Sequence, residues 1–435
     1  MTPSPANIIP CLTLLLTLFV TIDIKAQEKT FIKEYNYKAS EMDSKISSRA
    51  IALNEIRSML LNEIGVYVKS ESTLTTTEAG GGFSQDFAEK ITTITAGIAK
   101  LEILEEKWTG EEFWLKASIT INNKDLEQSL KQISEDEKTL LELEYLKAKL
   151  ESATNEINKL KKQLAKDPSS ANKQQEKYNT EVKILIASEF IYSAIEKLER
   201  KDHAGSIADF SQAIEVDPKN AELYFYRGFV KFDMEDFAGA ISDFDQAIAR
   251  NTAYFDSYYF RGIAKKSTED YVGSLNDFTF LIEKAAPKYQ DAYFYRGAIR
   301  NYFDDHRGAI DDLTKYNNLS SPHAESFYEL GFAKHFLNDL DGAVQDLSKA
   351  IEINPNYIEA LMFRGYSYLL LKDFAMAVPD FTKILQVDPY AGHAYYSRGL
   401  ALLQMNEKIS GCKDMRSAAR YGEERAYEAI QRICK

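Results

Sequence analysis

Two cysteines near the C-terminus have the residue type and the spacing for a covalent reaction. We expect Cys412 near the start of one helix and Cys434 at the end of the next, with a turn at Gly422 between them. In an antiparallel pair of helices the two thiols then lie nearly level, offset by about 5 Å at 1.5 Å per residue. A disulfide would form in an oxidising compartment and hold the last helix in place. The alternative is two buried thiols that pack as small hydrophobic groups.

Other residue types that do chemistry are present without the necessary spacing. The five histidines are isolated from one another, at positions 203, 306, 323, 335 and 393, and no two have the helical spacing that metal ligation needs. The run Gly80-Gly81-Gly82 lacks the Gly-Lys-Ser/Thr ending of a phosphate-binding loop, and no nucleophile elbow or His-Glu-x-x-His run occurs. We therefore predict no catalytic residue, no metal, no cofactor and no enzymatic activity.

The C-terminal part of the chain is organised by an internal repeat. From residue 187 onward three markers recur at steps of 34 residues, with a single step of 35. A small residue comes first, at Ala194, Gly228, Gly262, Gly297, Gly331, Gly365 and Gly399. A second small residue follows twelve places later, at Ser206, Ala240, Ser274, Ala309, Ala343, Ala377 and Gly411. A large apolar residue comes four places after that, at Phe210, Phe244, Phe278, Leu313, Leu347, Phe381 and Met415.

This pattern predicts a stack of helix pairs. Short helices pack closely only where small residues lie at the crossing of their axes. Between the paired helices an acidic residue recurs where it can accept hydrogen bonds from the free backbone N–H groups of the second helix, at Asp202, Asp236, Asp270, Asp305, Asp339 and Asp373. We predict seven helix pairs and a different, capping helix over residues 423–434, because an end repeat needs a cover.

The repeat resembles the tetratricopeptide repeat, and the resemblance covers more than half of the chain. It implies an α-solenoid whose first helices line a concave groove. By that resemblance one groove position is aromatic in five repeats of six, and it comprises Phe225, Tyr259, Phe294, Tyr328, Met362 and Tyr396. A second position, three residues earlier, is acidic in all but the last repeat, where it is His393, and it comprises Glu222, Asp256, Asp291, Glu325 and Glu359.

Aromatic and acidic side chains side by side favour a basic ligand. They would hold an extended peptide carrying Lys or Arg through cation–π contacts and charge complementarity. The alternative is that the rings pack between repeats. The Lys and Asn residues with which some family members bind acidic C-terminal peptides are absent at these positions, which argues against recognition of that kind.

A further series of charged residues is expected to be structural. Arg227, Arg261, Arg296, Arg364 and Arg398 on first helices match an Asp sixteen residues later on the second helix, and Leu330 interrupts the series. Recurrence through the array is typical of ion pairs between helices. A ligand site would need only some of them.

The segment 124–166 is predicted to be a long charged helix with a coiled-coil stripe. Its apolar residues follow the a/d alternation for three heptads, at Leu143, Leu146, Leu150, Ala153, Ile157, Leu160 and Leu164. A single helix must bury such a stripe, so the segment either forms a homodimer or folds back onto a neighbouring domain. The polar residues 167–182 are interpreted as a linker, with the repeat array at 183–435.

Residues 27–123 are predicted to form a small α+β domain. A helix ends at Gly65, a strand opens at Val66-Tyr67-Val68, a second helix covers 87–98, and strands lie at 113–121 and 31–38, with a turn at Thr109-Gly110. The runs Ile64-Gly65-Val66-Tyr67-Val68 and Thr95-Ala96-Gly97-Ile98 resemble the N-terminal domain of flagellar-assembly-T-type envelope proteins. That resemblance implies a domain that attaches to cell-envelope components.

The N-terminus is typical of an export signal. Residues 11–20 are apolar but too short to span a bilayer, and Ile24-Lys25-Ala26 is a suitable cleavage site, so residues 1–26 are interpreted as a signal peptide. Residues 1–10 carry no Lys or Arg, which is unusual for such a signal, and the alternative is a buried apolar segment. We expect a periplasmic or cell-envelope location.

Composition sets the outer limits on function. With 45% hydrophobic and 27% charged residues, the chain of 435 residues can bury a core. A net charge of −13 argues against nucleic acid as a partner and favours a basic one.

Together these patterns predict a mainly α protein. It has a small N-terminal α+β domain, a central coiled-coil helix and a C-terminal tetratricopeptide α-solenoid. The predicted function is an exported, non-enzymatic scaffold that binds a protein or peptide in the groove. The alternative is a cell-envelope assembly or regulatory factor that acts through the N-terminal domain, with the repeats as a positioning module.

Overall fold

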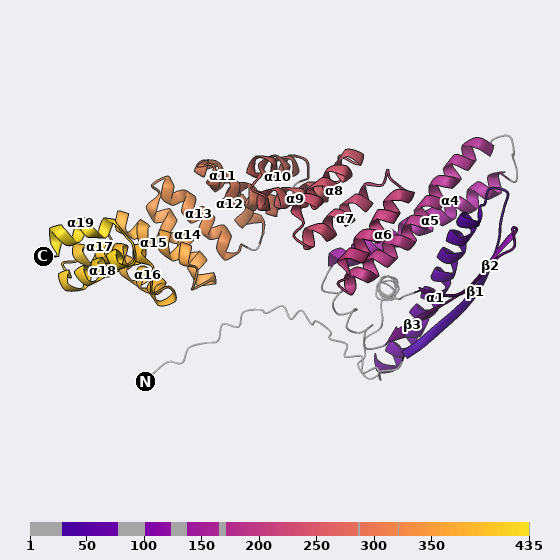
Figure 1. Cartoon of the computed structure of the whole chain (residues 1–435), viewed down its shortest axis with the longest axis horizontal. Coiled ribbons are helices and arrows are strands. Elements are labelled where there is room, and N and C mark those ends of the chain that lie inside the picture. The colour runs from indigo at the N-terminus through magenta and orange to yellow at the C-terminus, as the bar shows by residue number, and fades with distance from the viewer. Residues whose placement is uncertain are drawn as a thin grey trace, which may run out of the picture. The chain divides into compact units, whose positions relative to one another are not determined.

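The computed structural model describes residues 28–76, 101–122, 137–164, 171–285, 288–320 and 322–434 (Figure 1). The chain divides into two compact units, Met1–Pro218 and Lys219–Lys435. The predicted signal peptide, the helix at 87–98, the glycines at 80–82 and the start of the coiled-coil segment all lie outside the described residues.

The N-terminal unit contains an antiparallel sheet. Strands β1 (Glu28–Lys38), β2 (Leu101–Trp108) and β3 (Glu112–Asn122) pair in the order β1-β3-β2. The predicted strands at 31–38 and 113–121 are therefore confirmed. The turn after β2 is at Thr109-Gly110, where Gly110 has a φ of +99° and Thr109 Oγ1 accepts the N–H of Glu112 at 2.9 Å. Only glycine adopts such a φ readily, so this turn was visible in the sequence.

Helix α1 (Lys45–Thr76) covers the sheet and is longer than predicted. Its buried residues Leu53, Ile56, Leu60 and Ile64 have the expected helical spacing. The predicted stop at Gly65 and the strand at 66–68 are wrong, because the helix continues to Thr76. A glycine inside a helix costs about 1 kcal/mol, and packing beyond it offsets that amount: the Tyr67 ring lies 5.6 Å from that of Phe31 and 3.4 Å from Lys29 Nζ.

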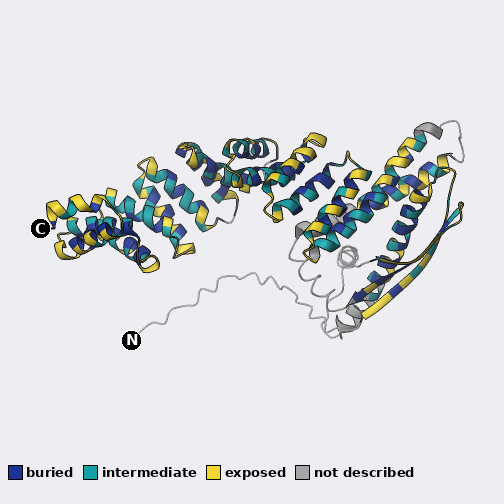
Figure 2. Cartoon of the chain, in the orientation of Figure 1, coloured by how far each residue is buried: buried dark blue, intermediate teal, exposed yellow. Residues whose placement is uncertain are grey.

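The long helices α4 (Glu137–Leu164) and α5 (Ala171–Glu199) complete the core of this unit. The stripe residues Leu150, Ala153, Ile157 and Leu160 are buried there against the rest of the unit. Figure 2 colours each helix of the chain by burial. Of the two alternatives for the coiled-coil segment, the structure thus has the fold-back. A homodimer through these four residues is wrong, because their apolar side chains are already covered by the same chain.

The segment predicted as a linker is largely helical. Helix α5 begins at Ala171, and the side chains of Tyr178, Val182 and Leu185 are buried in the core. Their spacing of four and three residues is that of one helix face. The linker prediction at 171–182 is wrong because the many polar residues between these positions made the apolar helix face hard to recognise in the sequence.

Seven helix pairs carry the repeat pattern in the described part of the chain, as predicted. The first pair, α5 with α6 (His203–Val216), belongs to the N-terminal unit. The C-terminal unit contains α7 (Ala221–Asp233), α8 (Phe237–Arg250), α9 (Phe255–Ser267), α10 (Tyr271–Ala285), α11 (Asp291–Tyr302), α12 (His306–Leu319), α13 (Ala324–Phe336), α14 (Leu340–Ile353), α15 (Ile358–Leu370), α16 (Phe374–Val387), α17 (Gly392–Gln404), α18 (Lys408–Arg420) and the capping helix α19 (Arg425–Ile433).

The first and third sequence markers are contact partners within each pair. A Cβ added to Gly365 would lie 2.7 Å from Cζ of Phe381, and one added to Gly331 would lie 2.6 Å from Cγ of Leu347. No real Cβ comes so close to a packed ring or branched carbon. Glycine therefore recurs about every 34 residues because it lies where the two helices of a pair are in contact.

The turns between paired helices also repeat. The predicted caps are confirmed, as in Asp236, whose carboxylate accepts the N–H of Gly239 at 3.0 Å. The residue before each cap position has a φ of 59 to 65° although none of the seven is glycine; they are Lys201, Glu235, Glu269, Asp304, Asn338, Lys372 and Asn406. This left-handed residue was not predicted, because only three of the seven, Asp304, Asn338 and Asn406, are of a type that favours it.

Buried ion pairs join the helices of each pair, as predicted. Arg261 Nε donates to Asp277 Oδ2 at 2.9 Å, and Lys265 Nζ lies 3.0 Å from the same oxygen. The Asp277 side chain is 4% exposed, so both cations face a carboxylate that water scarcely reaches. Where Leu330 interrupts the Arg series, Lys334 Nζ takes over and lies 2.6 Å from Asp346 Oδ2.

The two carboxylates that bind Arg261 provide a test of the structural role of the buried ion pairs. Asp277 is buried, whereas Asp245, whose Oδ1 lies 2.6 Å from Arg261 Nη1, is 51% exposed. We expect Asp277→Asn to lower the free energy of unfolding by about 3 kcal/mol, because it leaves two cations without their buried counter-ion. The exposed pair contributes less than about 1 kcal/mol, so Asp245→Asn is the matched control. Urea unfolding followed by circular dichroism measures both, and equal losses would contradict the structural role.

Candidate functional site

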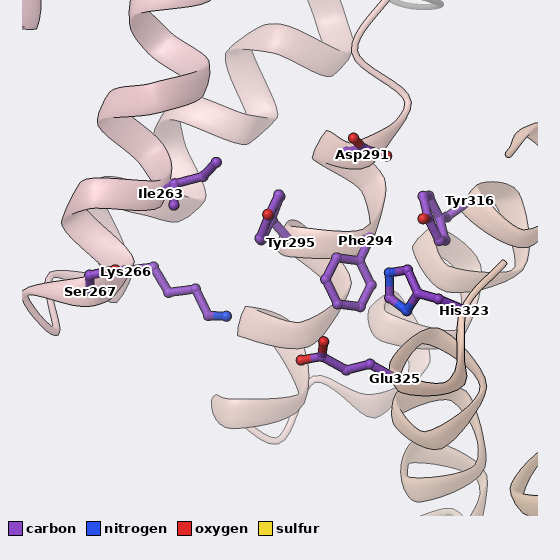
Figure 3. Close-up of a pocket in the computed structure, with 9 residues that line it drawn as sticks. All are labelled: Ile263, Lys266, Ser267, Asp291, Phe294, Tyr295, Tyr316, His323 and Glu325. Carbon is purple, nitrogen blue, oxygen red and sulfur yellow. The ribbon is translucent and has the colours of Figure 1, made fainter. Parts of the chain in front are cut away.

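A hollow of 610 Å³ lies on three consecutive repeats of the C-terminal unit (Figure 3). Its lining residues come from α9, α11, α12, the N-cap of α13 and the first turn of α13. The lining residues are Ile263, Lys266, Ser267, Asp291, Phe294, Tyr295, Tyr316, His323 and Glu325.

Aromatic rings make up one side of the hollow. The rings of Phe294 and His323 meet edge to face with centroids 4.8 Å apart, and Tyr316 lies 5.5 Å from Phe294. Phe294 and Tyr316 are buried, so they support the exposed ring of His323 from behind. His323 is also held by its backbone position as the cap of α13, where its Nδ1 accepts the N–H of Ser326 at 3.2 Å.

The charges around the hollow are mostly negative. The exposed carboxylates of Asp291 and Glu325 line it, and one ammonium group, Lys266, faces them from α9. Glu329, one helical turn after Glu325, is held by Asn301, whose Nδ2 donates to its Oε2 at 2.7 Å. Burial raises the pKa of Glu329, the charge of Glu325 adds to the shift, and Asn301 and Lys266 oppose it, so that the pKa is about 6. Near neutral pH three carboxylates therefore outnumber one cation.

Of the six residues predicted at the aromatic groove position, only Phe294 lines the hollow. Phe225 is 2% exposed and packs between Phe244 and Phe260, so it cannot contact a ligand. The half-buried members also pack inside the array, both within a helix pair and against the next element. These contacts join Tyr259 to Phe278 and Tyr295, Tyr328 to Tyr357 and Phe363, Met362 to the core around Phe381, and Tyr396 to Arg425 of the capping helix. Burial raises the pKa of Tyr259 and of Tyr328, in line with this packing.

The acidic position divides similarly. Asp291 and Glu325 line the hollow. Asp256 accepts a hydrogen bond from the Tyr289 hydroxyl at 2.8 Å, which is a contact within the array. Glu222 and Glu359 lie in the first turns of α7 and α15 and are not among the lining residues.

Sequence reasoning missed several lining residues. Ile263 and Lys266 follow Tyr259 by four and seven places, so helical spacing alone would have put them on the same face. Tyr316 and His323 gave no such signal. They come from the second helix of one repeat and the connection to the next, and only the folded array brings them to Phe294.

The predicted cysteine pair is joined by a disulfide in the structure. Cys412 in α18 and Cys434 at the end of α19 are both buried, with Cα atoms 5.4 Å apart. The link fixes the capping helix to the last repeat. Among the described residues, no three His, Cys, Asp or Glu side chains are placed to hold a metal ion. The helices in these ranges include none that is both long and apolar enough to cross a membrane.

A family model of the tetratricopeptide repeat matches residues 324–357 and 358–390, which are α13 with α14 and α15 with α16. This chain carries tetratricopeptide repeats. The other helix pairs repeat the ion-pair contact of the matched pairs. All but the first repeat the glycine, and all but the last repeat the aspartate cap, so they belong to the same array. Arrays of this kind present extended binding surfaces and serve as protein-interaction scaffolds.

Solved structures with similar repeats were also found. A crystal structure of MamA is 25% identical and covers 38% of this chain and 96% of its own, with a TM-score of 0.35. A tetratricopeptide repeat protein from Parabacteroides merdae is 18% identical and covers 57% and 99%, with a TM-score of 0.40. YrrB, described as a TPR protein with an unusual peptide-binding site, is 18% identical and covers 51% and 97%, with a TM-score of 0.31. No curated protein sequence matched the chain.

The disulfide provides a test of how the array is capped. We expect Cys434→Ser to expose the backbone of α19 to hydrogen exchange and to lower the free energy of unfolding by about 3 kcal/mol, the amount that a loop of this length implies. Hydrogen exchange followed by mass spectrometry over residues 425–433 measures the effect. Reduction of the unaltered chain should reproduce it, and reduction of the variant should add nothing. Unchanged exchange in this helix would contradict the role of the disulfide.

Proposed function

We propose that this chain is an exported, non-enzymatic scaffold whose tetratricopeptide array binds an extended segment of a partner protein that carries Lys or Arg. The observation that carries the proposal is the hollow on α9, α11 and α13. It combines a supported ring with carboxylates that outnumber the one cation facing them.

The chemistry of the hollow fits a basic side chain. The apolar stem of an Arg or Lys would lie against His323 and Tyr295, and its charged end would reach Asp291 or Glu325. Charge-assisted hydrogen bonds of this kind are stronger than neutral ones, and a guanidinium can meet a carboxylate with two of them. Lys266 is placed to donate to backbone carbonyl groups of the bound segment, which would fix its direction.

Binding of a fluorescein-labelled decapeptide of alternating Arg and Ser would test the site, with the Glu-Ser counterpart as the control peptide. The double change Asp291→Asn with Glu325→Gln should weaken binding about tenfold, the equivalent of one lost charge-assisted contact. The double change Glu222→Gln with Glu359→Gln alters the same repeat position outside the hollow and should leave binding unchanged. Equal effects of the two pairs would contradict the site, because binding would then depend on the acidic charge of the array as a whole.

The half-buried Glu329, one helical turn after Glu325, gives the same measurement an expected pH dependence. A bound cation favours the ionised form of this carboxyl group. At a pH where Glu329 is protonated in the free protein, binding must therefore release that proton. Because the pKa of Glu329 is about 6, affinity should rise with pH through that value and then level off. Lys266, Asp291, His323 and Glu325 line the hollow itself, and Glu329→Gln isolates the contribution of Glu329. A pH profile that this substitution leaves unaltered would contradict the assignment.

The export part of the proposal rests on two features. The apolar run at 11–20 is followed by a cleavage site at Ala26, and the two cysteines of the mature chain are paired, which is usual for proteins of oxidising compartments. A periplasmic or cell-envelope location follows, with partners among envelope components. Mass spectrometry of the chain isolated from its own cells should find Gln27 as the first residue and no free thiol. A retained Met1 with reduced cysteines would rule out export.

A further inference from the structure

A second surface of the C-terminal unit is apolar and exposed. In three consecutive repeats the last residue of the first helix and the residue after it are both large and apolar. We call these six residues the turn ridge: Tyr302 and Phe303 after α11, Phe336 and Leu337 after α13, Leu370 and Leu371 after α15. Their exposed fractions are 63, 46, 53, 41, 58 and 38% in that order.

The repeat fold does not require the turn ridge. The equivalent positions in the other repeats of this unit hold Asp233-Met234, Ser267-Thr268 and Gln404-Met405, each with a polar residue first. Those pairs form the same helix ends without two apolar side chains. Met234 and Met405 are exposed, but each stands without an apolar neighbour before it. Pairs of exposed apolar residues that gather on adjacent repeats are typical of an interaction surface.

The three repeats that carry the turn ridge are in direct contact. Helix α13 contacts both α11 and α15. The Phe336 ring stacks on His306 of the preceding repeat at 5.1 Å and lies 6.0 Å from Phe363 of the next. Because packed helices lie 8–10 Å apart, the turn ridge extends over about 20 Å.

The exposed charges beside the turn ridge are mainly negative. They lie in the same turns and at the starts of the second helices, and comprise Asp304, Asp305, Asp339, Asp341 and Asp373, against Arg307 and Lys372. Most of these carboxylates cap helices and are fixed in place. A partner that covers the apolar side chains would therefore place its own basic residues at the edge.

We infer that the turn ridge binds an amphipathic α-helix of a partner protein, with one apolar face flanked by Lys or Arg. Seven residues of a helix rise about 10.5 Å, close to the spacing of adjacent repeats, so apolar residues one heptad apart would meet successive repeats. An extended strand fits less well. Three residues of a strand cover the same distance, and every third side chain changes face. This surface lies on other residues than the hollow, and the inference does not depend on the function proposed for the hollow.

The test uses an 18-residue, fluorescein-labelled peptide with Leu on one helical face and Lys on the other. We expect saturable binding to the full mature chain, and a loss of about tenfold in affinity on Leu337→Glu with Leu370→Glu. Ile353→Glu is the matched control, because Ile353 is an exposed apolar residue at the far end of α14 in the middle repeat of the turn ridge. It should leave the affinity unchanged.

A second variant tests the charges without touching the apolar residues. Asp304→Lys should weaken binding of the Lys peptide several-fold, and the fold tolerates Lys at this position because Lys201 and Lys372 occupy it in other repeats. A scrambled peptide with Leu on all faces should bind weakly. Equal binding of the scrambled peptide, or unchanged binding to the double Glu variant, would overturn the inference. So would self-association in sedimentation that the double Glu variant abolishes, because the occupant would then be a second copy of this chain.

Discussion

The close approach of the two helices in each pair is the constraint on which the C-terminal unit depends. Glycine on the first helix lets the ring or branched side chain of the second, as in Gly365 with Phe381, lie directly against its backbone. This contact fixes the distance at which an Arg such as Arg364 can reach its buried Asp, with Nε 2.9 Å from Asp380 Oδ2. The packing contact and the ion pair thus depend on each other, and both recur along the array.

Because the interior of each pair is set by this device, differences between repeats appear on its outer faces. In the middle of the array the faces diverge: α9, α11 and α13 leave a hollow with carboxylates and rings, and the ends of α11, α13 and α15 present exposed apolar residues. Neither feature is needed to stack helices. The residues of both features are therefore not constrained by helix stacking and are available for binding.

Much of this architecture could be predicted from sequence spacing, because the contacts within a pair recur at a fixed interval. The Gly, Asp and Arg positions all follow from that interval. The errors have a different origin. Helix α1 passes through Gly65, and α5 begins among polar residues at Ala171, because distant packing decides both. The hollow was predicted only through Asp291, Phe294 and Glu325, since His323 reaches it from outside the regular repeat.

The central claim is that the hollow is open to a basic segment of another protein. A photoreactive amino acid in place of Tyr295, in the full chain expressed in its own cells, tests this most directly. We predict cross-links to one partner, at peptides that carry Lys or Arg next to the attachment point, and none of these from the same group at the exposed Tyr427. Cross-links from position 295 only to this chain itself would show that the hollow is already filled, and would contradict the account.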